Sequence, residues 1–242
     1  MTPTRPTLRE ALAAPDSKGR HVRRLFSTIA DRYDLITVLL SYGQDRRWKR
    51  RIVELSEAGN RSRVLDLACG TGDIALAIAG RGASVVGLDI THRMVQIARA
   101  KASREQATAR FVTGDMMALP FRDGEFDVVT TGYGIRNVPE IAQAIAEMRR
   151  VLKPGGVLLS LDFNRPLNAV VRGVYLAYLT VVGSALGFVL HRDPDTYRYI
   201  SESIRRYPGA IEVNAMIRRQ GFSASEYLPV LGGLMAIHHA RK

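Results

Sequence analysis

Acidic side chains mark the ends of three strands predicted in the middle of the chain. Asp66 lies within the segment VLDLACGTGD, which ends at Asp73, Asp89 ends the segment VVGLD, and Asp115 follows a third apolar strand. The ligand site of an α/β domain forms where the carboxyl ends of its parallel strands meet. We therefore expect these carboxylates to surround one ligand, and their negative charge favours a cationic one.

The glycine turn alone is compatible with a dinucleotide. Gly70, Gly72 and Ala75 match the loose pattern G-x-G-x-x-A. A dinucleotide, however, lays its pyrophosphate on the start of the helix that follows such a turn, and Asp73 occupies that position. Carboxylates repel a pyrophosphate and attract an ammonium and a sulfonium, so the predicted cofactor is S-adenosylmethionine.

Two of the acids have predicted roles within this site. Asp89 is placed to accept hydrogen bonds from both ribose hydroxyls; its alternative role is to cap the next helix, which Thr91 could do instead. Asp115 could bind the adenine amino group while Met116 covers the ring, or it could form an ordinary Asx-turn. The predicted cofactor-binding residues are Asp66, Gly70, Thr71, Gly72, Asp89, Ile90, Asp115, Met116 and Gly132.

Strand and helix patterns alternate around these residues, which is typical of a parallel sheet with right-handed crossovers. The predicted fold is α/β: a Rossmann-like, seven-stranded, mainly parallel sheet with helices on both faces and an N-terminal helical lid. The predicted strands cover 63–68, 84–89, 109–113, 126–131, 157–162, 223–230 and 234–240.

The chain divides into four predicted parts. Prolines and the absence of periodicity predict a flexible tail over 1–18, and an apolar repeat of three or four residues predicts a helical lid over 19–60. The cofactor-binding core covers 61–162, and substrate helices with the C-terminal strands cover 163–242.

The charge balance points to an anionic partner. Lysine and arginine exceed aspartate and glutamate by 35 to 23, and the run RRWKRR at 46–51 is the densest cluster. Trp48 inside that run favours peripheral contact with an anionic membrane surface. Residues 173–190 are uncharged and approach the length of a membrane span, but we interpret them as a buried or interfacial helix. The expected location is the cytoplasm, at the inner face of the membrane.

The single cysteine limits other chemistry. Cys69 excludes a disulfide framework and a cysteine-based zinc cluster. His238 and His239 alternate on a predicted strand, so at most one of them points inward, and no metal site is expected. An oligomeric state is not indicated, and a homodimer is an open alternative.

Several segments are shared with one known family: YDLITVLLSYGQDRRWK, LDLACGTGD, GYGIRNV, RVLKPGG and PDTYRYISESIRRYP. On these segments the chain resembles class I methyltransferases and, more closely, the ubiquinone/menaquinone biosynthesis C-methyltransferase family. The resemblance implies methyl transfer to a ring carbon of a demethylated quinol with an isoprenoid tail, demethylmenaquinol or a related quinol. The form GYG of the loop segment favours the menaquinone or plastoquinone-like branch.

The loop after the fourth predicted strand holds the predicted catalytic residues, where the methyl acceptor should meet the cofactor. Arg136 is expected to stabilise the phenolate that develops on the quinol, through a water or directly, and Asn137 to orient a ring oxygen. The alternative is that Arg136 pairs with an acid and Asn137 caps the next helix. Tyr133 could stack on adenine or quinol, and Tyr33 and Asp34 of the lid are expected to close over the site.

Three other functions remain open. The positive charge also fits a nucleic-acid methyltransferase, but GYGIRNV stands where amino-directed enzymes of that class carry an Asn/Asp-Pro-Pro-aromatic turn, and no cysteine lies there to act as a nucleophile. We therefore expect no nucleic-acid partner. The same lid could admit another phenolic or polyketide metabolite, and a non-catalytic module that only binds the cofactor is the third alternative.

Overall fold

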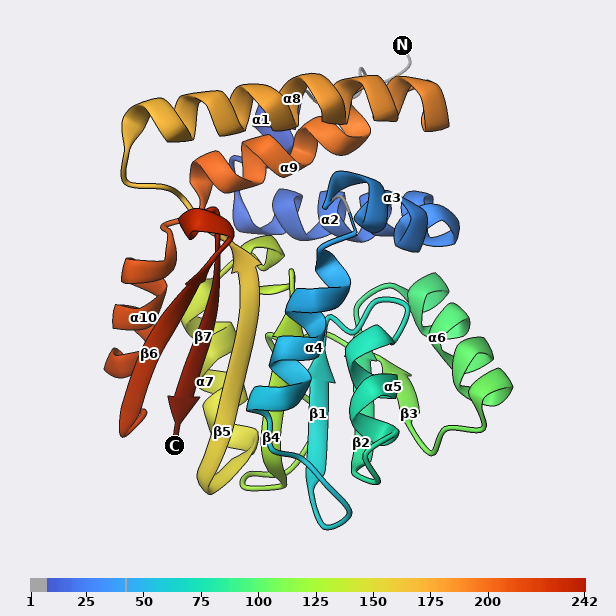
Figure 1. The fold of residues 1–242 in the computed structure, drawn as a ribbon, viewed down its shortest axis with the longest axis vertical. Helices are drawn as coiled ribbons and strands as arrows, with labels where there is room; N and C mark the ends of the chain where they lie inside the picture. Colours follow the sequence, from blue (N-terminus) through green and yellow to red (C-terminus); the bar gives the residue numbers. More distant parts are fainter. Residues whose placement is uncertain (1–7, 42) are drawn as a thin grey trace.

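A computed structural model describes residues 8–41 and 43–242. Its centre is a seven-stranded sheet in the order β3-β2-β1-β4-β5-β7-β6 (Figure 1). The first five strands along the chain are parallel, while β7 runs antiparallel to both β5 and β6. The predicted α/β fold class is thereby confirmed. The strands are β1 (Arg63–Leu67), β2 (Ser84–Asp89), β3 (Arg110–Thr113), β4 (Phe126–Gly132), β5 (Leu152–Phe163), β6 (Ala224–Val230) and β7 (Met235–Arg241).

Helices cover both faces of the sheet because the central strands are apolar on both sides. Val64 of β1 contributes to one buried cluster and its neighbour Leu65 to the other, as the period of two in a strand requires. One cluster includes α4 (Asp45–Leu55), α5 (Asp73–Ala79) and α6 (His92–Glu105). The other includes α7 (Ile141–Val151) and α10 (Ala210–Arg219).

A separate helical layer lies across the carboxyl ends of the parallel strands (Figure 1). Its own buried cluster joins Leu25 and Ile29 from the N-terminal part of the chain to Tyr197 and Tyr199 from the C-terminal part. Segments far apart in sequence thus form one lid. Its elements are α1 (Leu8–Ala11), α2 (Pro15–Ile29), η1 (Ala30–Arg32), α3 (Tyr33–Leu40), α8 (Ala169–His191) and α9 (Asp195–Arg206).

The lid differs from the predicted division of the chain. Within the predicted tail, residues 8–11 and 15–18 are helical, and Leu8 and Leu12 are buried in the lid cluster, because apolar side chains at this spacing can pack on α9. Residues 1–7 of that tail lie outside the described residues. The prediction that α4 belongs to the lid is also wrong, since Ile52 and Val53 pack on the sheet.

One long helix, α8, is apolar enough to cross a membrane by length and composition. Only 22% of its most apolar window is buried, and Gly183 and Gly187 are on the side that packs against α9 and the turn before it. Large apolar side chains project away from the protein: Val174 is 67% exposed and Val189 is 74% exposed. The helix is therefore half lid and half exposed apolar surface.

Candidate active site

The turn after β1 brings backbone donors towards the end of β2. Gly70 has a positive φ of 54°, and its amide donates to the carboxylate of Asp89 at 2.9 Å. Gly72, with φ of 92°, lies behind the turn, where an added Cβ would approach the Phe111 ring at 3.0 Å. Both glycines were predicted to bind the cofactor. Gly70 lines the predicted cofactor pocket, whereas Gly72 does not line it and supports the turn from behind.

Asp89 is buried and held by two backbone amides. Its second oxygen accepts from Thr91 N at 2.8 Å, and each carboxylate oxygen keeps a further lone pair for a ligand hydroxyl. Desolvation raises the Asp89 pKa, while the two amide hydrogen bonds oppose the increase. Thr91 occupies the N-cap position of α6, as the sequence interpretation allowed, but its hydroxyl makes no capping bond.

Asp66 leaves one buried oxygen without a partner. Its Oδ1 accepts from the Thr130 hydroxyl at 2.7 Å, while Oδ2 has no hydrogen-bond partner within the described part of the chain. Burial raises the Asp66 pKa to about 7. The residue lines a small pocket with Gly70 and Thr71. A buried carboxylate with an unused oxygen suits a ligand ammonium, so these residues fit the methionine end of S-adenosylmethionine.

Asp73 does not contribute negative charge as predicted. Lys49 lies 2.8 Å from one of its oxygens and Lys101 lies 2.9 Å from the other. These two lysines lower the Asp73 pKa against the effect of burial and neutralise its carboxylate. The preference of the site for a cation therefore depends on Asp66 and Asp89.

The same lysine network ties the lid to the glycine turn. Asp34 of α3 accepts from the Thr71 hydroxyl at 2.6 Å and lies 2.6 Å from Lys101. The Tyr33 ring lies next to Gly70 and lines the pockets on both sides. Both residues thus lie where the sequence interpretation expected the lid to close.

The main cofactor pocket contains most of the predicted residues: Gly70, Asp89, Ile90, Asp115, Met116 and Gly132. Asp115 accepts from Met117 N at 2.9 Å, which is the Asx-turn proposed as its alternative role. Met116 is buried against the pocket. An Asx-turn uses one oxygen of Asp115, so this bond is compatible with the predicted contact to adenine.

The loop after β4 is built around a strained tyrosine. Tyr133 has φ of 61°, a left-handed conformation that a non-glycine residue adopts at a cost of about 1–3 kcal/mol. Its carbonyl accepts from Arg136 Nη1 at 3.0 Å and from Asn137 Nδ2 at 2.8 Å. Gly134 follows, where an added Cβ would lie 2.5 Å from the Thr131 hydroxyl. The three predicted catalytic residues therefore form one hydrogen-bonded unit.

Arg136 is buried and paired with an acid that sequence reasoning did not identify. Its Nη1 lies 2.5 Å from Asp162 Oδ1, its backbone amide donates to Oδ2 at 3.1 Å, and its guanidinium lies 4.7 Å from the centre of the Phe163 ring. The alternative role of Arg136 as an ion-pair partner is thus observed, and the residue also lines a pocket. Asp162 is the penultimate residue of β5, so the pattern of acids at strand ends could have identified it.

Asn137 does not cap the next helix, because Glu140 holds that position in α7. Its Oδ1 instead accepts from the Tyr199 hydroxyl at 2.8 Å. Tyr199 belongs to PDTYRYISESIRRYP, a segment for which the sequence interpretation proposed no site residue. Its contact with Asn137 connects α9 to the loop after β4.

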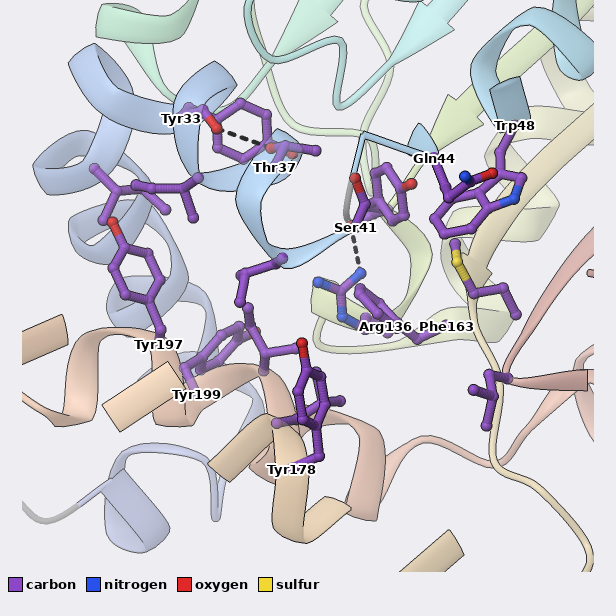
Figure 2. Close-up of a pocket in the computed structure, with 18 of the residues that line it drawn as sticks. Tyr33, Thr37, Ser41, Gln44, Trp48, Arg136, Phe163, Tyr178, Tyr197 and Tyr199 are labelled. Atoms are coloured by element: carbon purple, nitrogen blue, oxygen red, sulfur yellow. Dashed lines mark hydrogen bonds between the residues drawn. The ribbon is translucent and has the colours of Figure 1, made fainter. Parts of the chain in front are cut away.

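A second, mostly apolar pocket of about 300 Å³ adjoins the cofactor pocket. Phe26, Tyr33 and Tyr133 line both. Figure 2 shows Arg136 beside Phe163 in this pocket, and Leu179 of α8 also lines it. An aromatic ring with an apolar tail fits such walls, with the Arg136 guanidinium as the charged group.

The cationic neighbours of Trp48 led us to expect a side chain at an interface, and this expectation is wrong. Trp48 is 7% exposed and lines the apolar pocket, because it lies on the inward face of α4. Arg46, Arg47, Arg50 and Arg51 are exposed.

Across residues 8–41 and 43–242, no three His, Cys, Asp or Glu side chains converge in a group that could hold a metal ion.

Sequence comparison places the chain in a family. A model of the ubiE/COQ5 methyltransferase family matches residues 14–242. A demethylmenaquinone methyltransferase of Thermus thermophilus is 43% identical over 88% of this chain and 98% of its own length. A ubiquinone/menaquinone biosynthesis C-methyltransferase UbiE of Azotobacter vinelandii is 39% identical over 95% of this chain and 93% of its own length.

Solved structures agree on the fold. A methyltransferase of Thermotoga maritima that depends on S-adenosylmethionine aligns with a TM-score of 0.66 and 18% identity, over 92% of this chain and all of that one. A second one, from Aquifex aeolicus, aligns with a TM-score of 0.58 and 15% identity, over 80% of this chain and 88% of that one. The chain therefore belongs to the ubiE/COQ5 methyltransferase family and is an S-adenosylmethionine-dependent methyltransferase.

Proposed function

We propose that this chain methylates a ring carbon of a demethylated isoprenoid quinol, with demethylmenaquinol as the first candidate. The observation that carries the proposal is the apolar pocket, which meets the cofactor pocket at Tyr33 and Tyr133 and contains Arg136. The names of the relatives point to the same class of acceptor.

The chemistry requires a more nucleophilic ring. Bound S-adenosylmethionine supplies a methyl group on a sulfonium, which is already a strong electrophile. A phenolic hydroxyl with a pKa of about 10 is mostly protonated at neutral pH, and a nearby guanidinium in a buried site favours its ionised form. Arg136 is held for this role by Asp162 and by the Tyr133 carbonyl.

Asn137 has a revised role in this proposal. Both ends of its amide are engaged, one by the Tyr133 carbonyl and one by the Tyr199 hydroxyl. We assign it the task of positioning these two tyrosines around the quinol ring. Tyr133, which lies between the two pockets, would contact both the cofactor and the ring.

The isoprenoid tail requires an apolar route from a membrane. We propose that the chain acts in the cytoplasm and docks on the inner face of an anionic membrane through the outward side of α8. Its exposed valines, with Val174, Val181 and Val189 each at least two-thirds exposed, offer an apolar contact. The inward side of the same helix supplies Tyr175, Tyr178 and Leu179 to the acceptor pocket.

Purified protein with labelled S-adenosylmethionine and short-tailed demethylmenaquinol tests the proposed activity. We expect label on a ring carbon of the product and much slower labelling when Asp89→Asn protein is used at low cofactor concentration. The demethylated benzoquinol and a soluble phenol are run in parallel. Label only on the soluble phenol would support the second candidate, a methyltransferase of another phenolic metabolite, which the same pocket walls could admit.

A further inference from the structure

A polar cavity of about 290 Å³, separate from the acceptor pocket, is also lined by Arg136. Lys18, Glu140, Ser203 and Tyr207 line it. Arg136 is the residue that this cavity shares with the acceptor pocket, among the described residues. The two spaces therefore meet at the guanidinium of the buried Arg136–Asp162 ion pair.

The cavity connects buried groups to solvent. Its lining includes the exposed residues Pro15 and Glu140 as well as the buried residues Ser203, Tyr207 and Arg136. Lys18 in the same lining is half-buried, and its ammonium donates to the Val138 carbonyl at 2.6 Å. The space thus reaches from the protein surface to the inner end of the loop after β4.

Two buried polar atoms at the inner end lack partners. The Tyr207 hydroxyl and Arg136 Nε have no hydrogen-bond partner within the described part of the chain, although both are enclosed. Burying such groups unpaired costs on the order of 1–3 kcal/mol each, and water is the usual partner in a polar space of this size. Ordered water between the Tyr207 hydroxyl and Arg136 would satisfy both groups.

The proposed reaction requires such a route. Methylation of a ring carbon forms one C–C bond, breaks the bond between the cofactor sulfur and its methyl group, and releases the hydrogen of that carbon as a proton. One proton therefore leaves the site in every turnover. The acceptor pocket is walled mainly by apolar and aromatic side chains, and its mouth would be filled by the substrate tail, so the proton needs another exit.

We infer that the polar cavity behind Arg136 is the water-filled path by which the reaction proton reaches solvent, with the Tyr207 hydroxyl as the relay next to Arg136. This inference rests on the proposed function. Tyr207 does not touch the quinol and therefore acts as a positioning residue for the water beside Arg136. Burial raises the Tyr207 pKa, so its hydroxyl stays protonated and can both donate and accept.

Tyr207→Phe tests the path with almost no change of shape. We expect kcat to fall about tenfold, less than the roughly hundredfold or more that loss of a general acid or base at the reacting atoms costs, while KM for the quinol and the cofactor Kd stay unchanged. Imidazole should partly restore kcat in proportion to its concentration, because a small buffer can carry the proton instead. Ser203→Leu, which fills the cavity, should show the same loss. Tyr227→Phe on β6, which lines neither cavity, is the matched control.

The results separate this inference from the proposed function. If wild-type protein methylates the quinol but Tyr207→Phe matches Tyr227→Phe in kcat, the path is wrong and the function stands. A loss of kcat that imidazole does not reduce would also overturn it. If wild-type protein methylates no quinol, the proposed function fails and this inference fails with it. Should Ser203→Leu not fold, the result for Tyr207→Phe still decides the question.

Discussion

The guanidinium of Arg136 and the carboxylate of Asp162 lie 2.5 Å apart, and the two side chains are 5% and 1% exposed. They come from the loop after β4 and from the end of β5, which are neighbouring strands of the sheet. The pair thus fixes the charged group of the acceptor pocket to the rigid core. Because both side chains are buried, removal of either one would leave the other as a buried charge without a partner.

Breaking this pair should destabilise the protein strongly. Arg136→Met and Asp162→Leu should each lower the free energy of unfolding by about 3–5 kcal/mol, because each leaves one buried charge without its partner. The double variant should lose less than the sum of the two, which urea unfolding of all four proteins measures. If the loss of unfolding free energy in the double variant equals the sum of the two single losses, the two charges are not coupled in the folded state.

Cofactor binding and turnover should respond to different residues. Asp89→Asn should raise the cofactor Kd by roughly 10- to 150-fold, since hydrogen bonds to a charged group are worth about 1.5–3 kcal/mol. Arg136→Ala should lower kcat by on the order of a hundredfold, as loss of a charge-stabilising group does, with the cofactor Kd nearly unchanged. Titration calorimetry and initial rates give both numbers, and parallel changes in Kd and kcat would refute the division of roles.

Cofactor affinity should increase as the pH rises towards neutrality. Burial raises the Asp66 pKa to about 7, so the folded apoprotein keeps a proton that the unfolded chain loses near pH 4. The stability that this proton contributes is present below about pH 4 and is lost as the pH rises through 7. A bound ammonium favours the ionised carboxylate, so Kd should fall up to about tenfold per pH unit between pH 5.5 and 7.

Asp66→Asn is the control for this pH dependence. The amide does not titrate, so the variant should have a higher cofactor Kd than the wild-type protein at pH 7. This Kd should be nearly constant between pH 5.5 and 7. Calorimetry in two buffers of different ionisation enthalpy would also detect the proton released on binding by the wild-type protein. An identical slope of Kd against pH in the variant would assign the titration to another group.

Membrane binding should depend on the outward side of α8. Val174→Asp together with Val181→Asp should abolish flotation with vesicles that contain anionic lipid, because two carboxylates would enter the apolar contact. Methyl transfer to a soluble short-tailed quinol should persist. Ala77→Asp on the exposed side of α5 is the control for added charge. Flotation that is equal in all three proteins would exclude α8 as the contact.

The sequence allowed the cofactor side of the site to be predicted because its residues follow strand ends in order. Asp66, Asp89 and Asp115 each lie at or near the carboxyl end of a parallel strand, and parallel strands place those ends at one edge. Local order along the chain therefore translates directly into proximity. The same reasoning placed Arg136 and Asn137 at that edge.

Local order along the chain did not predict which helix faces pack together in the lid or which charged side chains pair. Asp73 was expected to face a ligand cation, but Lys49 and Lys101 arrive from two other helices and neutralise it. Trp48 was expected at an interface, but the rotation of α4 turns it inward to the acceptor pocket. These outcomes depend on which helix faces pack together, and an amphipathic pattern does not specify its partner.

By itself, the sequence of this protein determined the sheet, the glycine turn and the acids that surround the cofactor, because strand periodicity and chain order are sufficient for a parallel α/β core. Only the tertiary structure decided that Asp162 holds Arg136, that Tyr199 reaches Asn137, and that a polar cavity ends at Tyr207. The first two of these contacts join residues that lie 26 and 62 positions apart in the chain. Contacts of this kind arise from the packing of whole helices and strands, which no local pattern encodes.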